Sequence, residues 1–374
     1  MPDHALFDTP EQSFPKLNKA DWSRAASLEI QGKNPLEHLI WKSQDEINFL
    51  PYYDLQDIKS LDYLRNFETP PVLSHAGPRS WNNLPKVTVS RIEDANAVAL
   101  NHLANGADGI LFDLGQQESV NIDQLLADID WSICNVSFLV TPSPTLIQSI
   151  KNHVSKKNYD PGLLSGALFC NSAPGEVISH LNNFRAFTLF RSWGIRISSH
   201  SPVAAISNAL VQVVALLDAC SSPQEKEFAW RNISLSLAAG TEFFLEIAKL
   251  KAARLLLFQI AQAFDLSNYS EVEIHVSVDP WVNEKFQPNS NMLNGTCAAL
   301  SAIVGGCNSL TILPEDEFNS TSNRIARNVS NILREEAHIN KVSDPLAGSY
   351  AIENIVDSLA KAVWKDFQQN VRQA

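Results

Sequence analysis

The chain has 374 residues, 45% apolar, 19% charged and 9% aromatic, a composition typical of a globular protein with a large core and not of a disordered one. Its 29 Lys and Arg residues face 41 Asp and Glu residues, and the formal net charge of -12 argues against nucleic acid or an anionic membrane as the main partner. The five cysteines form no C-x-x-C pair, which argues against a disulfide framework or zinc site and favours a reducing compartment.

The N-terminal region carries Asp, Glu, Lys and Pro where a signal peptide would have an apolar core. No uninterrupted apolar stretch approaches the roughly 20 residues that a membrane helix needs. We therefore expect a cytoplasmic protein without a membrane segment.

Residues 1–80 differ from the rest of the chain. Aromatic and proline residues such as Trp22, Trp41, Tyr52 and Tyr53 alternate with polar ones, and no long periodic segment dominates. This pattern predicts an extended N-terminal arm with short helices. Such an arm could pack on its own domain or wrap a partner subunit.

From residue 81 onward, short apolar or β-branched runs alternate with longer stretches of helical periodicity. Eight candidate strands lie at residues 86–90, 109–113, 136–140, 165–170, 194–199, 232–237, 272–278 and 309–313. Eight strand–helix repeats are typical of a (β/α)8 TIM barrel, although a doubly wound sheet has the same local signals. We predict an α/β chain with a barrel and C-terminal helices over residues 81–374.

Helical periodicity is clearest in four segments. One apolar stripe runs through residues 203–217, and residues 243–264 are apolar nearly all round, which predicts a buried or subunit-facing helix. Two amphipathic helices are expected near the C-terminus, with apolar faces made by Ile325, Val329, Ile332 and Leu333, and by Ile352, Ile355, Leu359, Val363 and Phe367.

The sequence lacks the short catalytic motifs that recur in many enzyme families. It contains no G-x-G-x-x-G after a strand, P-loop, H-E-x-x-H or G-x-S-x-G pattern, so dinucleotide, P-loop, zincin and lipase-type chemistry lose their usual support. Asp113 and His200 each end a predicted strand, where barrels place their active sites. A single carboxylate there also caps a helix or orders a loop, so Asp113 alone does not define a site.

Three linked motifs occupy the C-terminal third, at residues 324–328 (RIARN), 335–339 (EEAHI) and 342–350 (VSDPLAGSY). Two upstream segments, 244–255 and 291–306, agree with them. From about residue 86 to 367 the chain thus resembles the methylmalonyl-CoA mutase family. We expect Arg324, Arg327 and Asp344 to fix helix and loop junctions through charge-assisted hydrogen bonds.

The resemblance implies an acyl-CoA isomerisation by a radical route that starts from adenosylcobalamin. In the family the CoA arm threads the barrel, and cobalamin lies at the C-terminal mouth on a separate flavodoxin-like domain. The site then needs a dry tunnel, a hydrogen-bond donor to the thioester carbonyl and polar groups for the carboxylate. Nothing in this chain matches the family's D-x-H-x-x-G cobalamin motif, so we expect no cofactor on this chain alone.

Several positions depart from the family's substrate site. The family's Tyr-His pair after the fifth strand falls on Ser199-His200, so the histidine is kept and the tyrosine is lost. His200 could donate a hydrogen bond to a carbonyl, or it could be bonded to a neighbouring loop. The family's Ser-Arg pair falls on Asp279-Pro280, and the Asp and Arg of its next motif fall on Gln287 and Asn294. A lost arginine removes a bidentate anion clamp.

The family segment that supplies another active-site tyrosine also has no recognisable copy at residues 79–83. This pattern resembles the small, non-catalytic subunit of a heterodimeric mutase, whose complex uses adenosylcobalamin. The partner would be the catalytic large subunit, with a homodimer as the other possibility. His200 is the one candidate catalytic residue, in a vestigial role.

Two other functions stay open. One is an active acyl-CoA mutase barrel that uses a separate B12-binding chain, and the other is an assembly or binding module of the mutase system. Whether the lumen of the barrel is open or closed distinguishes these two functions from a non-catalytic subunit. Small residues such as Ala238, Ala239 and Gly240 would leave it open, whereas an inward Phe or Trp would close it.

Overall fold

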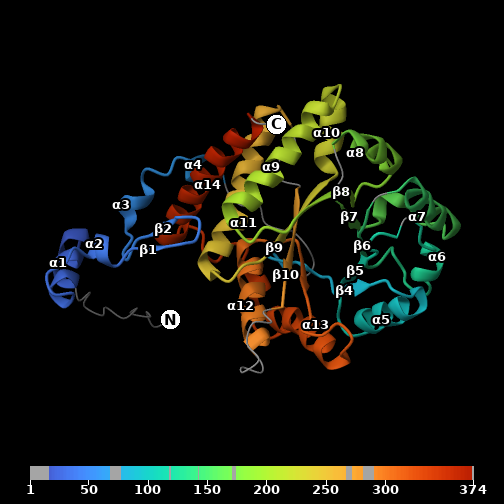
Figure 1. Cartoon of the computed structure of the whole chain (residues 1–374), viewed down its shortest axis with the longest axis horizontal. Helices are drawn as coiled ribbons and strands as arrows, with labels where there is room; N and C mark the ends of the chain where they lie inside the picture. The colour runs from blue at the N-terminus through green and yellow to red at the C-terminus, as the bar shows by residue number, and fades with distance from the viewer. Residues whose placement is uncertain are drawn as a thin grey trace, which may run out of the picture.

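The computed structural model describes residues 17–67, 77–117, 119–141, 143–170, 174–266, 272–280 and 290–372. A parallel sheet lies at its centre with helices around it, and a series of short N-terminal elements extends to one side (Figure 1). The fold therefore has two visibly different parts, a layered α/β body and a thin N-terminal projection.

Parallel strands within the described residues form one sheet in the order β3-β11-β10-β9-β8-β7-β6-β5-β4. Their bounds are β3 (Asn82–Asn83), β4 (Lys86–Thr88), β5 (Gly109–Asp113), β6 (Asn135–Leu139), β7 (Gly166–Cys170), β8 (Phe190–Ile197), β9 (Ile233–Ala238), β10 (Glu273–Val278) and β11 (Ser309–Ile312). Each of the eight predicted strands is present in this set.

The two end strands of that order, β3 and β4, are halves of one strand separated by Leu84 and Pro85. On one edge the Leu84 N–H donates to the carbonyl of Leu310 (2.9 Å), and on the other the Leu111 N–H donates to the carbonyl of Pro85 (3.0 Å). Pro85 has no N–H of its own, which accounts for the break in regular pairing. The sheet thus closes on itself, and the predicted (β/α)8 barrel is confirmed.

Strand β8 starts four residues before the predicted boundary at residue 194. The charged Arg191 obscures the apolar pattern in the sequence, and in the structure it forms an ion pair with Glu273 of β10 (3.0 Å). The register between β7 and β8 also shifts between Ala167 and Phe169. A charged side chain and a bulge therefore hide the start of this strand from pattern analysis.

Helices cover the outside of the sheet and alternate with its strands. They are α5 (Ile92–Ala104), α6 (Ile122–Leu125), α7 (Pro144–Lys156), α8 (Pro174–Leu181), α9 (Pro202–Ala219), α10 (Pro223–Arg231), α11 (Phe243–Ala263), α12 (Ser290–Gly305), α13 (Ser320–Glu335) and α14 (Tyr350–Val371), with 3₁₀ turns at Pro161–Leu163, Asn182–Phe184 and Ile339–Lys341. Serine N-caps followed by proline begin α7, α9 and α10, which explains why these helices start where they do.

Three long helices, α9, α11 and α14, pack together on one side of the barrel (Figure 1). Helix α11 is buried on nearly every face, as predicted, and the predicted apolar residues of α14 are all buried. By length and composition α9 could cross a membrane, in contrast to the expectation that no such stretch exists. Its apolar residues pack on α11, α14 and β8, and half of the apolar window is buried.

The predicted apolar face of α13 is partly wrong. Val329 and Leu333 are buried, but Ile325 and Ile332 are exposed, and Ala326 with Arg327 takes their place on the inner face. The small side chain of Ala326 allows close approach to the barrel, so the buried stripe is rotated by about one residue from the one that hydrophobicity predicts.

The N-terminal part consists of α1 (Lys19–Glu29), α2 (Pro35–His38), a hairpin of β1 (Trp41–Lys42) and β2 (Asn48–Phe49), α3 (Leu55–Ile58) and α4 (Tyr63–Asn66). Helix α1 has no buried residue and projects away from the barrel, whereas α4 and the hairpin lie beside α14 (Figure 1). The attachment is both apolar and polar: Ile47 belongs to the main apolar core, and the Tyr63 hydroxyl donates to the Glu353 carboxylate of α14 (2.5 Å).

Candidate functional site

The barrel mouth, formed where the strands end at their carboxyl side, is lined first by an ion-pair cluster. Lys86 of β4 contacts Glu317 (2.8 Å) and Asp113 of β5 (3.6 Å), and Thr88 donates to Glu317 (2.9 Å). Burial raises the pKa of Glu317, but the hydrogen bonds from Lys86 and Thr88 outweigh it and leave that pKa below its usual range. Asp113 also accepts from the Gly115 N–H (3.1 Å), so it orders a loop and balances a lysine.

His200 lies three residues past the end of β8 and is exposed to solvent. Within the described residues its side chain makes no hydrogen bond, whereas its neighbour Ser201 caps α9 and donates to Asp45 of the N-terminal part (2.7 Å). Asp45 also accepts from the Val203 N–H (3.1 Å). The N-terminal part therefore reaches the loop that carries His200.

Arg196 is a mouth residue that the sequence analysis missed. It pairs in register with Ser236 of β9, which faces the lumen, while the flanking Ile195 and Ile197 point outward into the helical shell. Its side chain is exposed, and no ion pair to it is found in the described part of the chain. A charged residue between two buried isoleucines of a strand is the signal that could have identified it.

Below Arg196 the lumen is filled by side chains, which together we call the lumen floor. The ring of Phe169 on β7 packs against the ring of His275 on β10, with centroids 5.0 Å apart, and both residues are 2% exposed. A small separate apolar cluster packs at the same level, formed by Leu84, Leu111, Ala167 and Phe169. An inward Phe thus closes the lumen although Ala238 and Ala239 are small.

Hydrogen bonds in the lumen floor run in one direction across four strands. The Thr311 hydroxyl donates to the carbonyl of Leu84 (2.6 Å), so it must accept from Nε2 of His275 (2.9 Å). Nδ1 of His275 then accepts from the Ser236 hydroxyl (2.8 Å). This bonding requires a neutral His275 with its proton on Nε2. Burial, followed by the charge of Arg196, lowers the pKa of His275 to about 3, which agrees.

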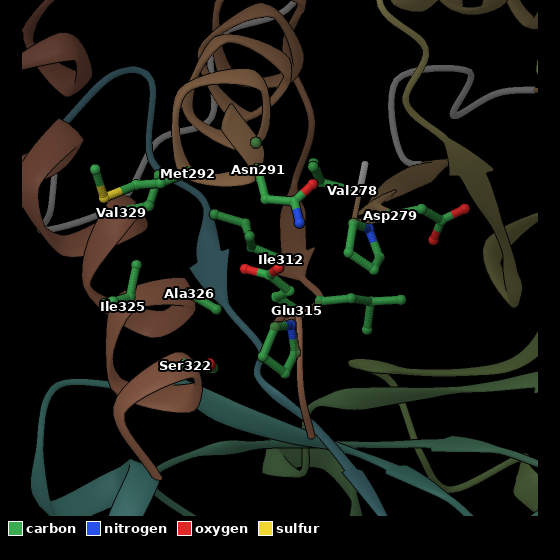
Figure 2. A pocket seen from close by; sticks show the side chains of 14 residues that line it. Val278, Asp279, Asn291, Met292, Ile312, Glu315, Ser322, Ile325, Ala326 and Val329 are labelled. Atoms are coloured by element: carbon green, nitrogen blue, oxygen red, sulfur yellow. The ribbon is translucent and has the colours of Figure 1, made fainter. Parts of the chain in front are cut away.

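A separate hollow of about 90 Å³ lies off the barrel axis, between the ends of β10 and β11 and helices α12 and α13 (Figure 2). Asp279, Pro280 and Asn291 line it, so these positions lie beside the mouth and not in the lumen. Asn294 is exposed and borders a smaller hollow of about 40 Å³ near Gly240. Gln287 lies outside the described residues.

The predicted structural role of the C-terminal motifs is confirmed for Asp344, which belongs to a charged cluster that we call the junction. Lys251 of α11 contacts both Asp344 and Glu353 of α14 (3.1 Å each), and Glu353 also accepts from the Gly348 N–H (2.9 Å). Burial, then the Glu353 carboxylate, raises the pKa of Tyr63 above its usual range, so Tyr63 stays a donor to Glu353.

The two arginines of the 324–328 motif differ. Arg327 is 6% exposed, its carbonyl accepts from Asn83 (3.1 Å), and its guanidinium lies 3.5 Å from His102 of α5. Arg324 is exposed, and no hydrogen bond or ion pair of its side chain is found in the described segments, so the prediction for it is wrong. The reason is its helical position, which faces away from the barrel.

No group of three or more His, Cys, Asp or Glu side chains that could hold a metal ion occurs among the described residues. The mouth instead offers one exposed guanidinium, one exposed imidazole and an internally balanced lysine, above a closed floor. This arrangement can attract an anion at the mouth, and the side chains of Phe169 and His275 occupy the lumen beneath it.

Comparisons with known proteins agree with the C-terminal motifs. The sequence profile described as Methylmalonyl-CoA mutase matches residues 204–373. A methylmalonyl-CoA mutase small subunit from Porphyromonas gingivalis is 27% identical over 390 residues, covering 95% of this chain and 63% of that protein. A small subunit from Streptomyces virginiae is 38% identical over 149 residues, covering 39% of this chain and 24% of that one. The chain thus spans less than two thirds of the length of these relatives.

More distant similarities extend over the same region. A methylmalonyl-CoA mutase from Rhizobium meliloti is 26% identical over 407 residues, covering 92% of this chain and 56% of that protein. A dihydropteroate synthase structure from Xanthomonas albilineans aligns with 13% identity and a TM-score of 0.37, over 67% of this chain and 92% of that one, a likeness too distant to bear on function. Residues 204–373 thus match the methylmalonyl-CoA mutase family, and the chain is similar to small subunits of that enzyme.

Proposed function

We propose that this chain is the barrel part of a methylmalonyl-CoA mutase small subunit, which pairs with a catalytic large subunit and does not itself isomerise methylmalonyl-CoA to succinyl-CoA. The observation that carries this proposal is the lumen floor. Phe169 and His275 occupy the axis along which the CoA arm of a family substrate would run. A substrate could pass only if both side chains moved and the bonds of His275 to Ser236 and Thr311 were lost.

The mouth above the floor supports the same proposal. Lys86 is neutralised by Asp113 and Glu317, which leaves it unavailable as a carboxylate ligand. His200 stands without the tyrosine that precedes it in the family, and it lacks a hydrogen-bond partner within the described residues to orient its ring. A catalytic imidazole is normally fixed by such a partner, so His200 is vestigial in this account.

The described residues do not fit adenosylcobalamin. A histidine that ligates a metal normally donates its other ring nitrogen to a second protein group, and His200 at the mouth has no such partner in the described part of the chain. His275, the nearest well-oriented imidazole, uses both ring nitrogens within the lumen floor. The cofactor of the proposed complex would therefore be held by the large subunit.

The N-terminal part supports a role in subunit pairing. We propose that residues 1–80 form an arm that wraps the partner, while residues 81–374 form the barrel. Leu28 is 79% exposed and Trp41 is 47% exposed, although both lie in ordered elements. The arm is fixed to the barrel at Tyr63 and Asp45, so its outer elements extend from an anchored base. Exposed apolar side chains on a projecting arm are suited to burial against another chain.

A reducing, cytoplasmic setting is part of the proposal. All five cysteines are free in the structure, and three of them, Cys170, Cys220 and Cys307, are buried. Thiols that are retained without pairing are typical of a reducing compartment.

Size-exclusion chromatography with light scattering tests the pairing, using this chain with the large subunit from the same source. We expect a one-to-one complex, and a variant that lacks residues 1–40 should lose most of it because the projecting elements are removed. The matched control is the exposed barrel substitution Lys361→Ala, which should leave the complex intact. Absence of a complex with the intact chain would contradict the proposal.

Titration of the isolated chain with coenzyme A by calorimetry tests the closed lumen. We expect no binding in the micromolar range. Binding together with turnover after addition of a separate B12-binding domain would make the chain an active barrel. A complex with the large subunit whose formation does not depend on cobalamin would favour an assembly module.

A further inference from the structure

Two guanidinium groups, one of a buried arginine and one of a partly exposed arginine, border the same glycine at the opposite end of the barrel from the mouth. Arg79 precedes β3 and is 1% exposed, and Arg254 lies in the middle of α11. A Cβ atom built on Gly306 would lie 2.5 Å from Nη1 of Arg79 and 3.7 Å from Nε of Arg254. Gly306 has a φ of +95°, so the absence of a side chain here is required by backbone conformation and by space.

The hydrogen-bond partners that the described residues offer to the Arg254 guanidinium are all neutral. Nη2 of Arg254 donates to the Gly306 carbonyl and to Oδ1 of Asn308 (2.6 Å each), and Nη1 donates more weakly to the Val272 carbonyl (3.4 Å). Nε of Arg254 and Nε and Nη1 of Arg79 are buried without any acceptor among the described residues. Three guanidinium nitrogens of the two cations, which together carry four N–H groups, thus remain unsatisfied within the described residues, although buried donors are almost always paired.

The surrounding charges do not balance. Arg79 interacts electrostatically with Asp344, and Arg254 interacts with Glu273. Asp344 in turn pairs with Lys251, and Glu273 pairs with Arg191. Lys251 also pairs with Glu353. Within the described residues, four cations therefore face three carboxylates, an excess of one positive charge. An unpaired buried charge is strongly unfavourable, so the cluster calls for one further negative charge.

Cys307 is the nearest group that could supply this charge from within the chain. It lies next to Gly306 and is fully buried. Burial raises the pKa of its thiol to about 12, even though both arginines act to lower it, so the thiol is neutral near pH 7. Cys307 therefore does not supply the missing charge.

We propose that a small monovalent anion, chloride being the simplest, binds between Arg79 and Arg254 beside Gly306. Its ligands are the N–H groups at Nε and Nη1 of Arg79 and at Nε of Arg254. The ion would connect α11 to the point where the chain enters the barrel, where the Arg79 N–H donates to the Asn340 carbonyl (3.2 Å). Its role is structural and is independent of the proposed subunit function.

Thermal unfolding of the full chain in sodium chloride and in sodium gluconate at equal ionic strength tests the site, because gluconate is too large to enter it. We expect a Tm higher by roughly 2–4 °C in chloride at 100 mM, with saturation as chloride increases. Arg79→Met should abolish this difference. The control Arg334→Met removes an arginine that pairs with Asp108 (2.8 Å) and should retain it.

Equal Tm values of the wild-type chain in the two salts would overturn the proposal, as would a chloride effect that persists in Arg79→Met. If Arg79→Met does not fold, crystals of the wild-type chain grown in sodium bromide decide the question. An anomalous bromide peak within hydrogen-bond distance of Arg79 and Arg254 is the expected result. Absence of a peak there, or a water in its place, would contradict the site.

Discussion

The junction and the lumen floor are both buried and polar, but the junction contains ion pairs and the lumen floor contains neutral hydrogen-bonded groups. The junction joins α11, α14 and the N-terminal part through Lys251, Asp344, Glu353 and Tyr63, and every charge in it has an opposite partner. The lumen floor contains the uncharged His275, held by hydroxyl groups and covered by Phe169. One region holds elements together, and the other fills a space that a substrate would need.

The junction and the mouth of the barrel also differ in how closely their sequences match the family. The motif that contains Asp344 is recognisable in the sequence because the junction is a requirement of the fold. Ser199 and Asp279, which align with substrate positions of the family, depart from its pattern, and Asp279 lines a hollow beside the mouth. Resemblance in a family signature can therefore report architecture without reporting the chemistry of a site.

The largest effect is expected from Lys251→Met. The substitution leaves the carboxylates of Asp344 and Glu353 buried without their cation, and we expect a loss of about 4 kcal/mol in the free energy of unfolding. Urea unfolding measures it. Lys361→Met, which removes the exposed partner of Asp357, is the control and should change stability by less than about 0.5 kcal/mol. Similar losses in both variants would contradict the structural role of the junction.

Phe169→Ala should cost somewhat less, about 3 kcal/mol, because it leaves a cavity in the lumen floor. Coenzyme A binding and mutase turnover would be measured on the same variant. In the proposed function we expect no turnover, since the family's tyrosine before His200 is still missing. Stability equal to that of the wild-type chain would show that Phe169 does not fill the lumen.

Acid should destabilise the protein between about pH 6.5 and pH 4. Burial, then Arg327, lowers the pKa of His102 to about 4, and the pKa of His275 is about 3. The unfolded chain binds these protons below pH 6.5 while the folded chain does not, so stability falls as pH falls, by about 1.4 kcal/mol per pH unit for each histidine.

Urea unfolding at pH 6.0, 5.5 and 5.0 measures this slope above the range where most carboxylates titrate. His102→Gln should remove about half of it. A stability that stays constant over this range would mean that both histidines are protonated in the folded chain.

The smallest effect on stability is expected at the mouth. Arg196→Met and His200→Ala change exposed side chains that make no ion pair or hydrogen bond within the described residues. We expect each to change the free energy of unfolding by less than about 0.5 kcal/mol. A larger loss in thermal or urea unfolding would mean that the mouth is part of the structural framework.

The barrel was predictable because its strands are short apolar runs between periodic helices, and local patterns of this kind survive in a single sequence. The lumen floor was not. Residues 166–170 are buried at every position, so no alternation shows that Phe169 points inward. The bonds of His275 depend on the register of strands that are distant in sequence, which composition cannot give.

The candidate site residues also differ in how far the sequence could predict them. The family resemblance located His200, but it could not show that the ring lacks an orienting partner. Arg196 went unnoticed because one charged residue in a strand has no motif around it. The exposed Ile325 and Ile332 show the opposite error, since hydrophobicity alone cannot tell which side of a helix a neighbouring element covers.

Mutase turnover of the complex is the most direct test of the proposed non-catalytic role. The large subunit would be combined with either the wild-type chain or the double variant Arg196→Met/His200→Ala, and kcat would be measured with saturating adenosylcobalamin and methylmalonyl-CoA. The account predicts the same kcat and the same one-to-one stoichiometry for both complexes. A fall in kcat of about tenfold or more with unchanged stoichiometry would place this barrel in the catalytic machinery and contradict the account.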